Sequence, residues 1–233
     1  MELILFLLRW LHFLAGITWI GLLYYFNLVQ TPFFAETEPA VRSGAIQKLV
    51  PRALWWFRWG AMFTFLAGIL IYLIKWGEQG AVFFHGPYGL SITLGGLLGT
   101  VMFLNVWLVI WPNQKIVIRS TTQVAQGGQA LPEAAGAARR AALTSRTNVV
   151  FSIPMLFFMG AASHYPAIVS GEPSGGALAG WIVFGWGMIA LVEINALVGT
   201  QGTTKQPLDT IKGTLLAGFV LSLYFWLLYT ILF

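Results

Sequence analysis

Three histidines and the absence of cysteine limit the chemistry open to this chain. The histidines are His12, His85 and His164. Zero cysteines exclude disulfides, thiolate metal sites, iron–sulfur clusters and covalently attached c-type haem. His12 lies in an apolar segment, and Ala15 and Gly16 follow it on the same helix face. An ionisable group at such a position indicates function by default. The small neighbours leave room for a planar cofactor, although the ring can equally bond a carbonyl of a neighbouring helix.

The segments that must position these histidines have the composition of a membrane protein. Of 233 residues, 58% are hydrophobic and only 9% are charged. In a typical soluble domain about a quarter of the residues are charged. Each membrane crossing needs about 20 mostly apolar residues. We therefore predict an all-α fold, a polytopic membrane bundle of about six transmembrane helices. The whole chain, 1–233, is expected to form a single transmembrane domain.

The apolar runs locate these helices. They are predicted at about 3–28, 53–74, 89–111, 147–169, 177–199 and 213–233. The first run is too long for a signal peptide and is interrupted by Arg9 and His12, so we expect it to be retained. Pro112 is expected to end the third run. The segment 112–146 is predicted to be a polar cytoplasmic loop, with a short Ala-rich surface helix at 132–144.

Basic residues predict the orientation. The first, third and fifth loops hold Arg42, Lys48, Arg52, Lys115, Arg119, Arg139, Arg140, Arg146, Lys205 and Lys212. The other two loops hold only Lys75. The positive-inside rule then places the odd loops in the cytoplasm and both termini in the periplasm of a bacterial inner membrane, with Arg9 as one contrary charge. The partner of this basic surface is the lipid bilayer and not nucleic acid.

This orientation puts all three histidines toward the outer face. His12 would lie about 13 Å deep and His164 about 8 Å deep at 1.5 Å per helical residue. We hypothesise a haem b held between the first and fourth helices, with His12 and His164 as axial ligands. Two neutral imidazoles would give a low-spin, electron-transfer iron. The alternative is that the small residues beside both histidines only let the helices pack closely.

Other side chains complete the predicted cofactor site. Gly16 offers a flat face, and Trp19 and Tyr165 offer aromatic walls. Arg9, one turn before the first histidine, is placed to meet a haem propionate. His85 lies in the outer loop 77–88, where it is either an exposed loop residue or, if the loop folds back, an alternative axial ligand.

A second polar set lies toward the cytoplasmic side. It comprises Arg58, Asn105, Glu193 and Asn195. These side chains form either a polar pocket that takes protons from the cytoplasm or an interhelical ion pair between Arg58 and Glu193 that fixes packing. The ion pair is favoured because no chain of carboxylates continues through the membrane.

Several motifs together resemble one known family. They are Leu11-His12 with Trp19-Ile20-Gly21, Leu54-Trp55-Trp56-Phe57-Arg58-Trp59, Asn105-Val106-Trp107, Trp111-Pro112-Asn113-Gln114-Lys115, Ser152-Ile153-Pro154-Met155 and Ser163-His164-Tyr165-Pro166. Over most of residues 9–169 the chain resembles the membrane domain of bacterial membrane-bound urate hydroxylases. The resemblance supports His12 and His164 as a site and implies urate oxidation as one activity.

The sequence also departs from that family. Family enzymes carry a C-terminal cytochrome c domain, and this sequence has no Cys-x-x-Cys-His. Late in the fifth helix, where the family would have basic and His residues, stands Glu193-Ile194-Asn195. A carboxylate there does not favour an anionic substrate unless Arg58 neutralises it.

These observations predict an integral membrane redox protein. It would bind haem b near the outer face and exchange electrons with a cytochrome or a larger respiratory complex. Two alternatives remain open: a urate-hydroxylase-like oxidoreductase that uses an external cytochrome c, and a cofactor-free accessory subunit of a membrane oxidase or monooxygenase complex.

Overall fold

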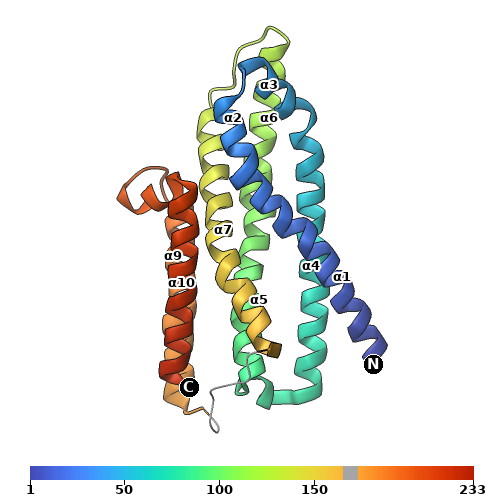
Figure 1. Ribbon diagram of the computed structural model, residues 1–233, viewed down its shortest axis with the longest axis vertical. Helices are drawn as coiled ribbons and strands as arrows, with labels where there is room; N and C mark the ends of the chain where they lie inside the picture. The colour runs from blue at the N-terminus through green and yellow to red at the C-terminus, as the bar shows by residue number, and fades with distance from the viewer. Residues whose placement is uncertain (165–172) are drawn as a thin grey trace.

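Helices account for nearly all of the computed structural model (Figure 1), which describes residues 1–164 and 173–233. These two ranges contain no strand, which confirms the predicted all-α class. Within them, six helical runs are long and apolar enough to cross a membrane, and the chain is a membrane protein. The runs are Glu2–Glu36, Val50–Phe84, Pro87–Ala125, Ala134–His164, Gly175–Leu197 and Ile211–Leu232.

The first and third runs are longer than predicted. Each contains a π-helix followed by a proline, and the helix continues past that proline. The first joins α1 (Glu2–Tyr24), η1 (Tyr25–Gln30) and α2 (Thr31–Glu36). The third joins α5 (Pro87–Leu104), η3 (Asn105–Ile110) and α6 (Trp111–Ala125). In both runs a proline follows the π-helix, Pro32 in one and Pro112 in the other.

The π-helix explains why these prolines do not end their helices. Proline lacks an N–H and its ring clashes with the carbonyl four residues back. A π-turn bonds five residues back, as the Thr31 N–H does to the Phe26 carbonyl oxygen. The wider turn accommodates the ring. The prediction that Pro112 ends the third helix was therefore wrong, and the helix continues to Ala125.

The second and fourth runs also extend past their predicted bounds. The second joins α4 (Val50–Gln79) and the 3₁₀ turn η2 (Gly80–Phe84). The fourth is α7 (Ala134–His164), which includes the segment predicted as a surface helix at 132–144. Ala137 and Ala141 are 0% and 1% exposed. Their small side chains let one face of this segment lie against its neighbours, whereas Ala135, Ala138 and Arg140 are exposed. The Ala-rich segment is therefore the start of α7, with one packed and one surface face, and not a separate short helix.

The last two runs match the prediction closely. The fifth consists of α8 (Gly175–Gly180), the π-helix η4 (Trp181–Trp186) and α9 (Gly187–Leu197), and the sixth is α10 (Ile211–Leu232). Between them lies the 3₁₀ turn η5 (Thr203–Asp209). In the first loop, α3 (Pro39–Lys48) follows the first run and packs near α6.

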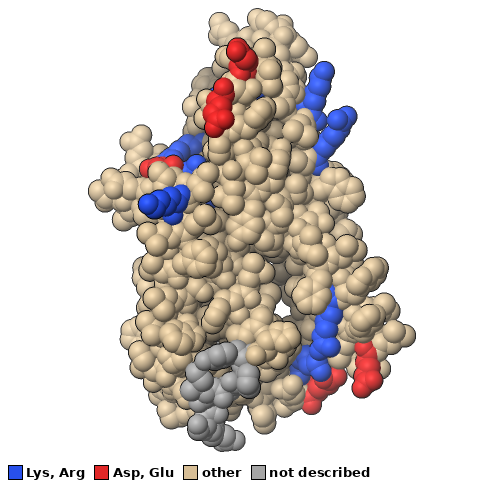
Figure 2. Space-filling view, viewed as in Figure 1, with Lys and Arg blue, Asp and Glu red and all other residues tan. Residues whose placement is uncertain are grey.

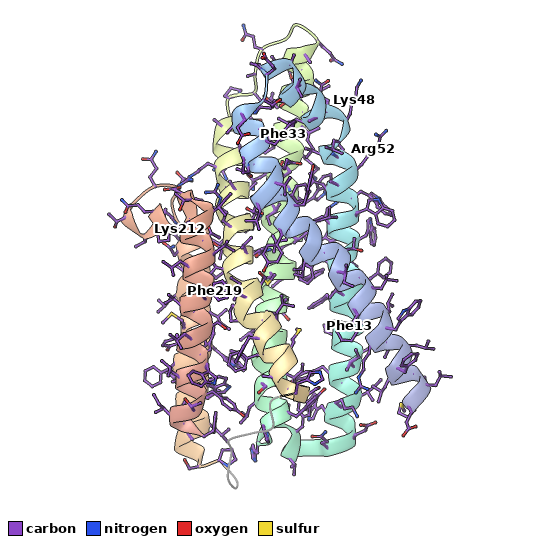
Figure 3. All side chains as sticks on the ribbon, in the orientation of Figure 1. Phe13, Phe33, Lys48, Arg52, Lys212 and Phe219 are labelled. Carbon is purple, nitrogen blue, oxygen red and sulfur yellow. The ribbon has the colours of Figure 1, made fainter. Side chains whose placement is uncertain are left out.

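Successive runs point in opposite directions, so both termini lie toward one end of the bundle (Figure 1). Lysine and arginine side chains occur at both ends of the face in Figure 2. Figure 3 labels Lys48, Arg52 and Lys212, which lie toward the end opposite the termini. The assignment of this end to the cytoplasm stays a prediction.

Helix α7 is the centre of the bundle and carries a polar stripe. Ser145, Asn148 and Ser152 follow one another at helical spacing. Their partners lie on the first and third runs: Asn27 Nδ2 donates to Ser145 Oγ (2.8 Å), Asn105 Nδ2 donates to Asn148 Oδ1 (2.9 Å), and the hydroxyls of Tyr24 and Ser152 share a hydrogen bond (2.8 Å). This stripe fixes how both runs sit on α7.

Candidate functional site

His12 lies on α1 and faces α4. Its Nδ1 is 2.8 Å from the carbonyl oxygen of Thr64. A carbonyl oxygen only accepts hydrogen bonds, so Nδ1 carries the proton and Nε2 keeps its lone pair in the neutral ring. Nε2 has no hydrogen-bond partner among the described residues, and it is not fully buried by them, so a bound group could reach it. The ring is thus held in one tautomer with its other nitrogen available.

Glycines let α1 and α4 approach each other around this ring. A Cβ atom at Gly68 would lie 3.0 Å from His12 Cε1, and one at Gly60 would lie 3.1 Å from the Trp19 backbone nitrogen. A Cβ atom at Gly16 would be in ordinary contact with Thr64, at 3.7 Å. The flat face that the sequence predicted beside His12 is therefore packed against α4, as small residues often are in membranes. Any planar group must lie on the Nε2 side of the ring.

Trp19 and Arg9 differ sharply in environment. Trp19 is 2% exposed, and its Nε1 has no hydrogen-bond acceptor among the described residues. It lies two turns from His12 along α1. An unpaired buried donor is costly and rare, but this one is fully shielded, so an oxygen of a bound group would reach it only if the side chain moved. Arg9, one turn before His12 in the other direction, is exposed.

His164 is the last residue of α7 and lines a different surface. It borders an open groove of about 700 Å³ between α7 and α10. Small residues Gly160 and Ala161 form part of this groove, and Phe219, labelled on α10 in Figure 3, forms part of the opposite wall. His12 is not among the residues that line it. Tyr165 lies outside the described residues.

The helices that carry His12 and His164 diverge. They are held together by the Tyr24–Ser152 hydrogen bond near the middle of α7 and separate toward the end that carries the termini (Figure 1). Figure 2 shows the surface hollowed between the separating segments. His85 is exposed and follows η2 at this same end. All three histidines thus belong to segments at one end of the bundle.

The second polar set is only partly brought together. Asn105 Nδ2 donates to Asn148 Oδ1 at 2.9 Å and to Glu193 Oε2 at 3.0 Å. Asn148 Nδ2 in turn donates to the Met102 carbonyl oxygen at 3.0 Å. The network joins the third, fourth and fifth runs. Asn195 is separate, because its amide donates to the Thr204 carbonyl oxygen in η5.

Arg58 does not pair with Glu193. Its guanidinium carbon lies 3.5 Å from the Trp111 ring centroid and 5.6 Å from that of Trp107. The ion pairs in 1–164 and 173–233 are Lys75–Glu78 and Arg139–Asp209. The expected pair is absent because α4 and α9 lie on different sides of α7 (Figure 1) and aromatic faces satisfy the cation instead.

Thr64 and Gly68 are site residues that the sequence did not reveal. Thr64 supplies the backbone carbonyl that orients His12, and its hydroxyl bonds the Gly60 carbonyl oxygen at 2.7 Å. A backbone contribution leaves no trace in residue type. Gly68 inside an apolar helix was a weak signal of close approach, but nothing indicated what approached it.

These features define a polytopic helical membrane protein with one anchored imidazole between its first two spans. The chain belongs to the family described as "Urate oxidase N-terminal", whose sequence profile matches residues 82–224, more than half of its length. The match includes His85, His164 and Glu193 and begins after His12. No curated protein and no solved structure matches the chain significantly. The family links the protein to urate-related oxidation.

Proposed function

We propose that this protein is a membrane oxidoreductase of the urate oxidase type that would hold haem b at the end of the bundle carrying the termini, with His12 as a residue that would hold it. One observation carries the proposal: His12 Nδ1–H donates to the Thr64 carbonyl oxygen at 2.8 Å and leaves Nε2 free. Metal-ligating histidines almost always donate their other N–H to a carbonyl or carboxylate, which fixes the tautomer and ring orientation.

The residues present fit a haem better than a bare metal ion. Among the described residues no group of three or more His, Cys, Asp or Glu side chains is placed to hold a metal. A haem brings four ligands of its own and asks the protein for one or two. The exposed Arg9 guanidinium, one turn before His12, is a donor for the haem carboxylates. When bound, the haem would supply one-electron transfer.

The surrounding residues have defined tasks in this proposal. The Thr64 carbonyl holds the proton on His12 Nδ1, and the absence of a side chain at Gly68 lets the ring lie flat against α4. His164, the second candidate ligand, borders the groove between α7 and α10, so its side chain would have to turn toward α1 to reach the group that His12 would hold. Apolar side chains around this group would exclude water.

The family suggests urate as the reductant. Hydroxylation of urate with water as the oxygen source releases two electrons and two protons. Two molecules of an external cytochrome c would accept the electrons, one each. This proposal places the haem end, with both termini, on the periplasmic side of a bacterial inner membrane, where such a cytochrome would reach it.

A reduced-minus-oxidised optical spectrum tests the haem. The purified protein should show a b-type spectrum that disappears in His12→Ala and His164→Ala and persists in His85→Ala. If His12→Ala keeps the full spectrum, His12 is not a ligand. A featureless wild-type spectrum sinks the redox proposal and leaves an accessory subunit of a larger oxidase as the better explanation.

A turnover assay with urate and oxidised cytochrome c tests the substrate separately. The expected result is cytochrome reduction that depends on urate and is lost in His12→Ala. A haem spectrum without urate-dependent reduction would make the protein an electron carrier whose reductant is another molecule.

A further inference from the structure

Two cations and several tryptophans meet between α4 and the third run, in the half of the bundle away from the termini. The Arg58 guanidinium carbon lies 3.5 Å from the centroid of the Trp111 ring, and Lys115 Nζ lies 5.5 Å from the same centroid. Both positive charges therefore approach one aromatic side chain. Neither the site proposed for haem nor the polar stripe on α7 uses them.

Neither cation has a negatively charged partner among the described residues. The ion pairs there are Lys75–Glu78 and Arg139–Asp209. Helix α6 contains no acidic residue, and the acidic residue of α4 is Glu78, near its opposite end. Like charges that approach one ring repel each other, so an anion in contact with both would stabilise the arrangement.

The N–H groups of these cations are accessible. Arg58 Nε donates to the Leu54 carbonyl oxygen at 3.2 Å. Contact with Trp111 occupies the flat side of the guanidinium, and its terminal N–H groups have no acceptor among the described residues. Arg58 is partly exposed and Lys115 is exposed. These donors can therefore meet phosphate oxygens, which match the guanidinium fork.

An exposed stripe of α4 beside Arg58 changes in polarity as a phospholipid does. Arg52 lies toward the end opposite the termini (Figure 3). Exposed aromatic and then aliphatic side chains follow it at helical spacing: Trp55, Trp56, Trp59, Phe63, Leu66 and Leu70. Charge thus gives way to aromatic rings and then to hydrocarbon, and tryptophan is enriched where headgroups meet acyl chains.

Aromatic contacts connect this stripe to the cations. The Trp59 ring centroid lies 6.3 Å from that of Trp55 and 5.7 Å from that of Trp107. The Arg58 guanidinium carbon is 5.6 Å from the Trp107 centroid. A phosphate held by the cations would therefore leave its acyl chains along a continuous apolar surface.

We propose that Arg58 and Lys115 bind the phosphate of an anionic phospholipid whose acyl chains lie along the exposed stripe of α4. The bilayer supplies this partner, and clustered basic residues attract anionic headgroups. The Arg58 fork would contact two phosphate oxygens, and Lys115 would add a point charge. The site faces α6, whereas His12 faces α4 from α1, so lipid binding does not depend on haem.

Native mass spectrometry of the purified protein in detergent tests the proposal with two lipids that have the same acyl chains. Dioleoyl phosphatidylglycerol is anionic, whereas dioleoyl phosphatidylcholine is zwitterionic. The anionic lipid should bind about tenfold more tightly, the effect of one charge-assisted contact. Equal retention of the two lipids would overturn the proposal. Displacement of the anionic lipid by an equal concentration of glycerol phosphate would also overturn it, because the site would then take a soluble phosphate.

Three variants locate the binding. Arg58→Met should weaken binding of the anionic lipid about tenfold, and the exposed Lys115→Met should weaken it about fivefold. Lys212→Met is the matched control and should bind as the wild type does, because it removes one exposed charge from α10, on the other side of α7 (Figure 1).

Two results with these variants would contradict the assignment. Unchanged binding in both Arg58→Met and Lys115→Met would show that the lipid lies elsewhere. An equal loss in Lys115→Met and Lys212→Met would show that net positive charge, and not this site, attracts the lipid.

Discussion

The two ends of the helical bundle use polar residues in opposite ways. In the half away from the termini, the amides and hydroxyls of the first and third runs pair with Ser145, Asn148 and Ser152 on α7. In the half near the termini, α1 and α7 diverge (Figure 1), and His12 makes one hydrogen bond, to a backbone carbonyl. The first half pairs most of its polar groups across helices, with Gln30 Oε1 and Trp107 Nε1 as exceptions among the described residues, and the second stays open.

The contrast shows how to separate polar residues that pack from those that bind. A polar group inside a membrane protein is satisfied by a neighbouring helix or by a ligand. Asn148 has a protein partner for both ends of its amide. His12 Nε2 and Trp19 Nε1 have none among the described residues. We therefore expect substitutions in the two halves to affect different properties.

Replacement of Asn148 should give the largest loss of stability. Asn148→Leu keeps the volume and removes its hydrogen bonds to Asn105 and to the Met102 carbonyl oxygen. Interhelical hydrogen bonds in membranes contribute up to about 1.7 kcal/mol each, so we expect a loss of about 2 kcal/mol. Unfolding of the protein in mixed micelles by increasing SDS, followed by circular dichroism, measures it.

His12→Leu is the comparison at the open end. It removes a single bond from a half-buried side chain, so its loss of stability in the protein without cofactor should be under about 1 kcal/mol. If His12→Leu destabilises the protein as much as Asn148→Leu does, the imidazole is a packing residue and the contrast between the ends fails.

Gly68→Val should remove cofactor binding with a smaller effect on folding. A Cβ atom there would lie 3.0 Å from His12 Cε1 and 3.2 Å from Nδ1, so the ring must shift and its bond to Thr64 must lengthen. The haem absorbance per protein should fall several-fold. Gly77→Val is the control, because nothing lies within 4 Å of a Cβ atom at Gly77. Equal absorbance in both variants would contradict the role given to His12.

The number of spanning helices was predictable, and their ends were not. Apolar runs of about 20 residues specify crossings by length alone. The errors fall where local rules compete with backbone geometry. Pro112 reads as a helix terminator, but the π-helix before it absorbs the missing N–H. The Ala-rich segment at 132–144 has little hydropathy, yet from Ala134 it continues into the spanning helix α7, because the small side chains on its buried face permit close packing.

Residue type predicted which positions are candidate site residues. The structure was needed to show which neighbours these residues contact. His12, Asn105 and Glu193 stood out because polar groups are rare inside apolar runs. Which neighbour each one faces depends on how the helices rotate and cross, and composition does not encode that. Charge alone suggested that Arg58 pairs with Glu193, but Arg58 lies on the Trp111 ring and Glu193 bonds Asn105.

A double-mutant cycle of Arg58→Met and Glu193→Gln tests whether these two side chains interact, and its effects on stability should be smaller than that of Asn148→Leu. Arg58→Met should cost about 1 kcal/mol through the lost contact with Trp111. Glu193→Gln keeps an oxygen for Asn105 and should change stability by less than about 0.5 kcal/mol. The two changes should add within about 0.5 kcal/mol. A coupling above about 1 kcal/mol would show that the two side chains do interact as an ion pair.

Lys205, in the loop between α9 and α10, should show the smallest effect, a dependence of stability on pH. It is 2% exposed, and its Nζ donates to the Val198 carbonyl oxygen at 3.0 Å. Burial, and then the nearby positive charge of Arg139, lower the pKa of Lys205 from its ordinary value of 10.5. The folded protein therefore loses this proton at lower pH than the unfolded chain does.

Between the two pKa values the unfolded chain binds more protons, so stability rises with pH in this window and is independent of this group below it. The wild-type unfolding midpoint should rise relative to that of Lys205→Met as the pH approaches 10.5. Parallel midpoints for the two proteins would mean that the ammonium is as well solvated folded as unfolded. In that case the paired half of the bundle is more open to water than its hydrogen bonds imply, and the contrast with the half carrying His12 weakens.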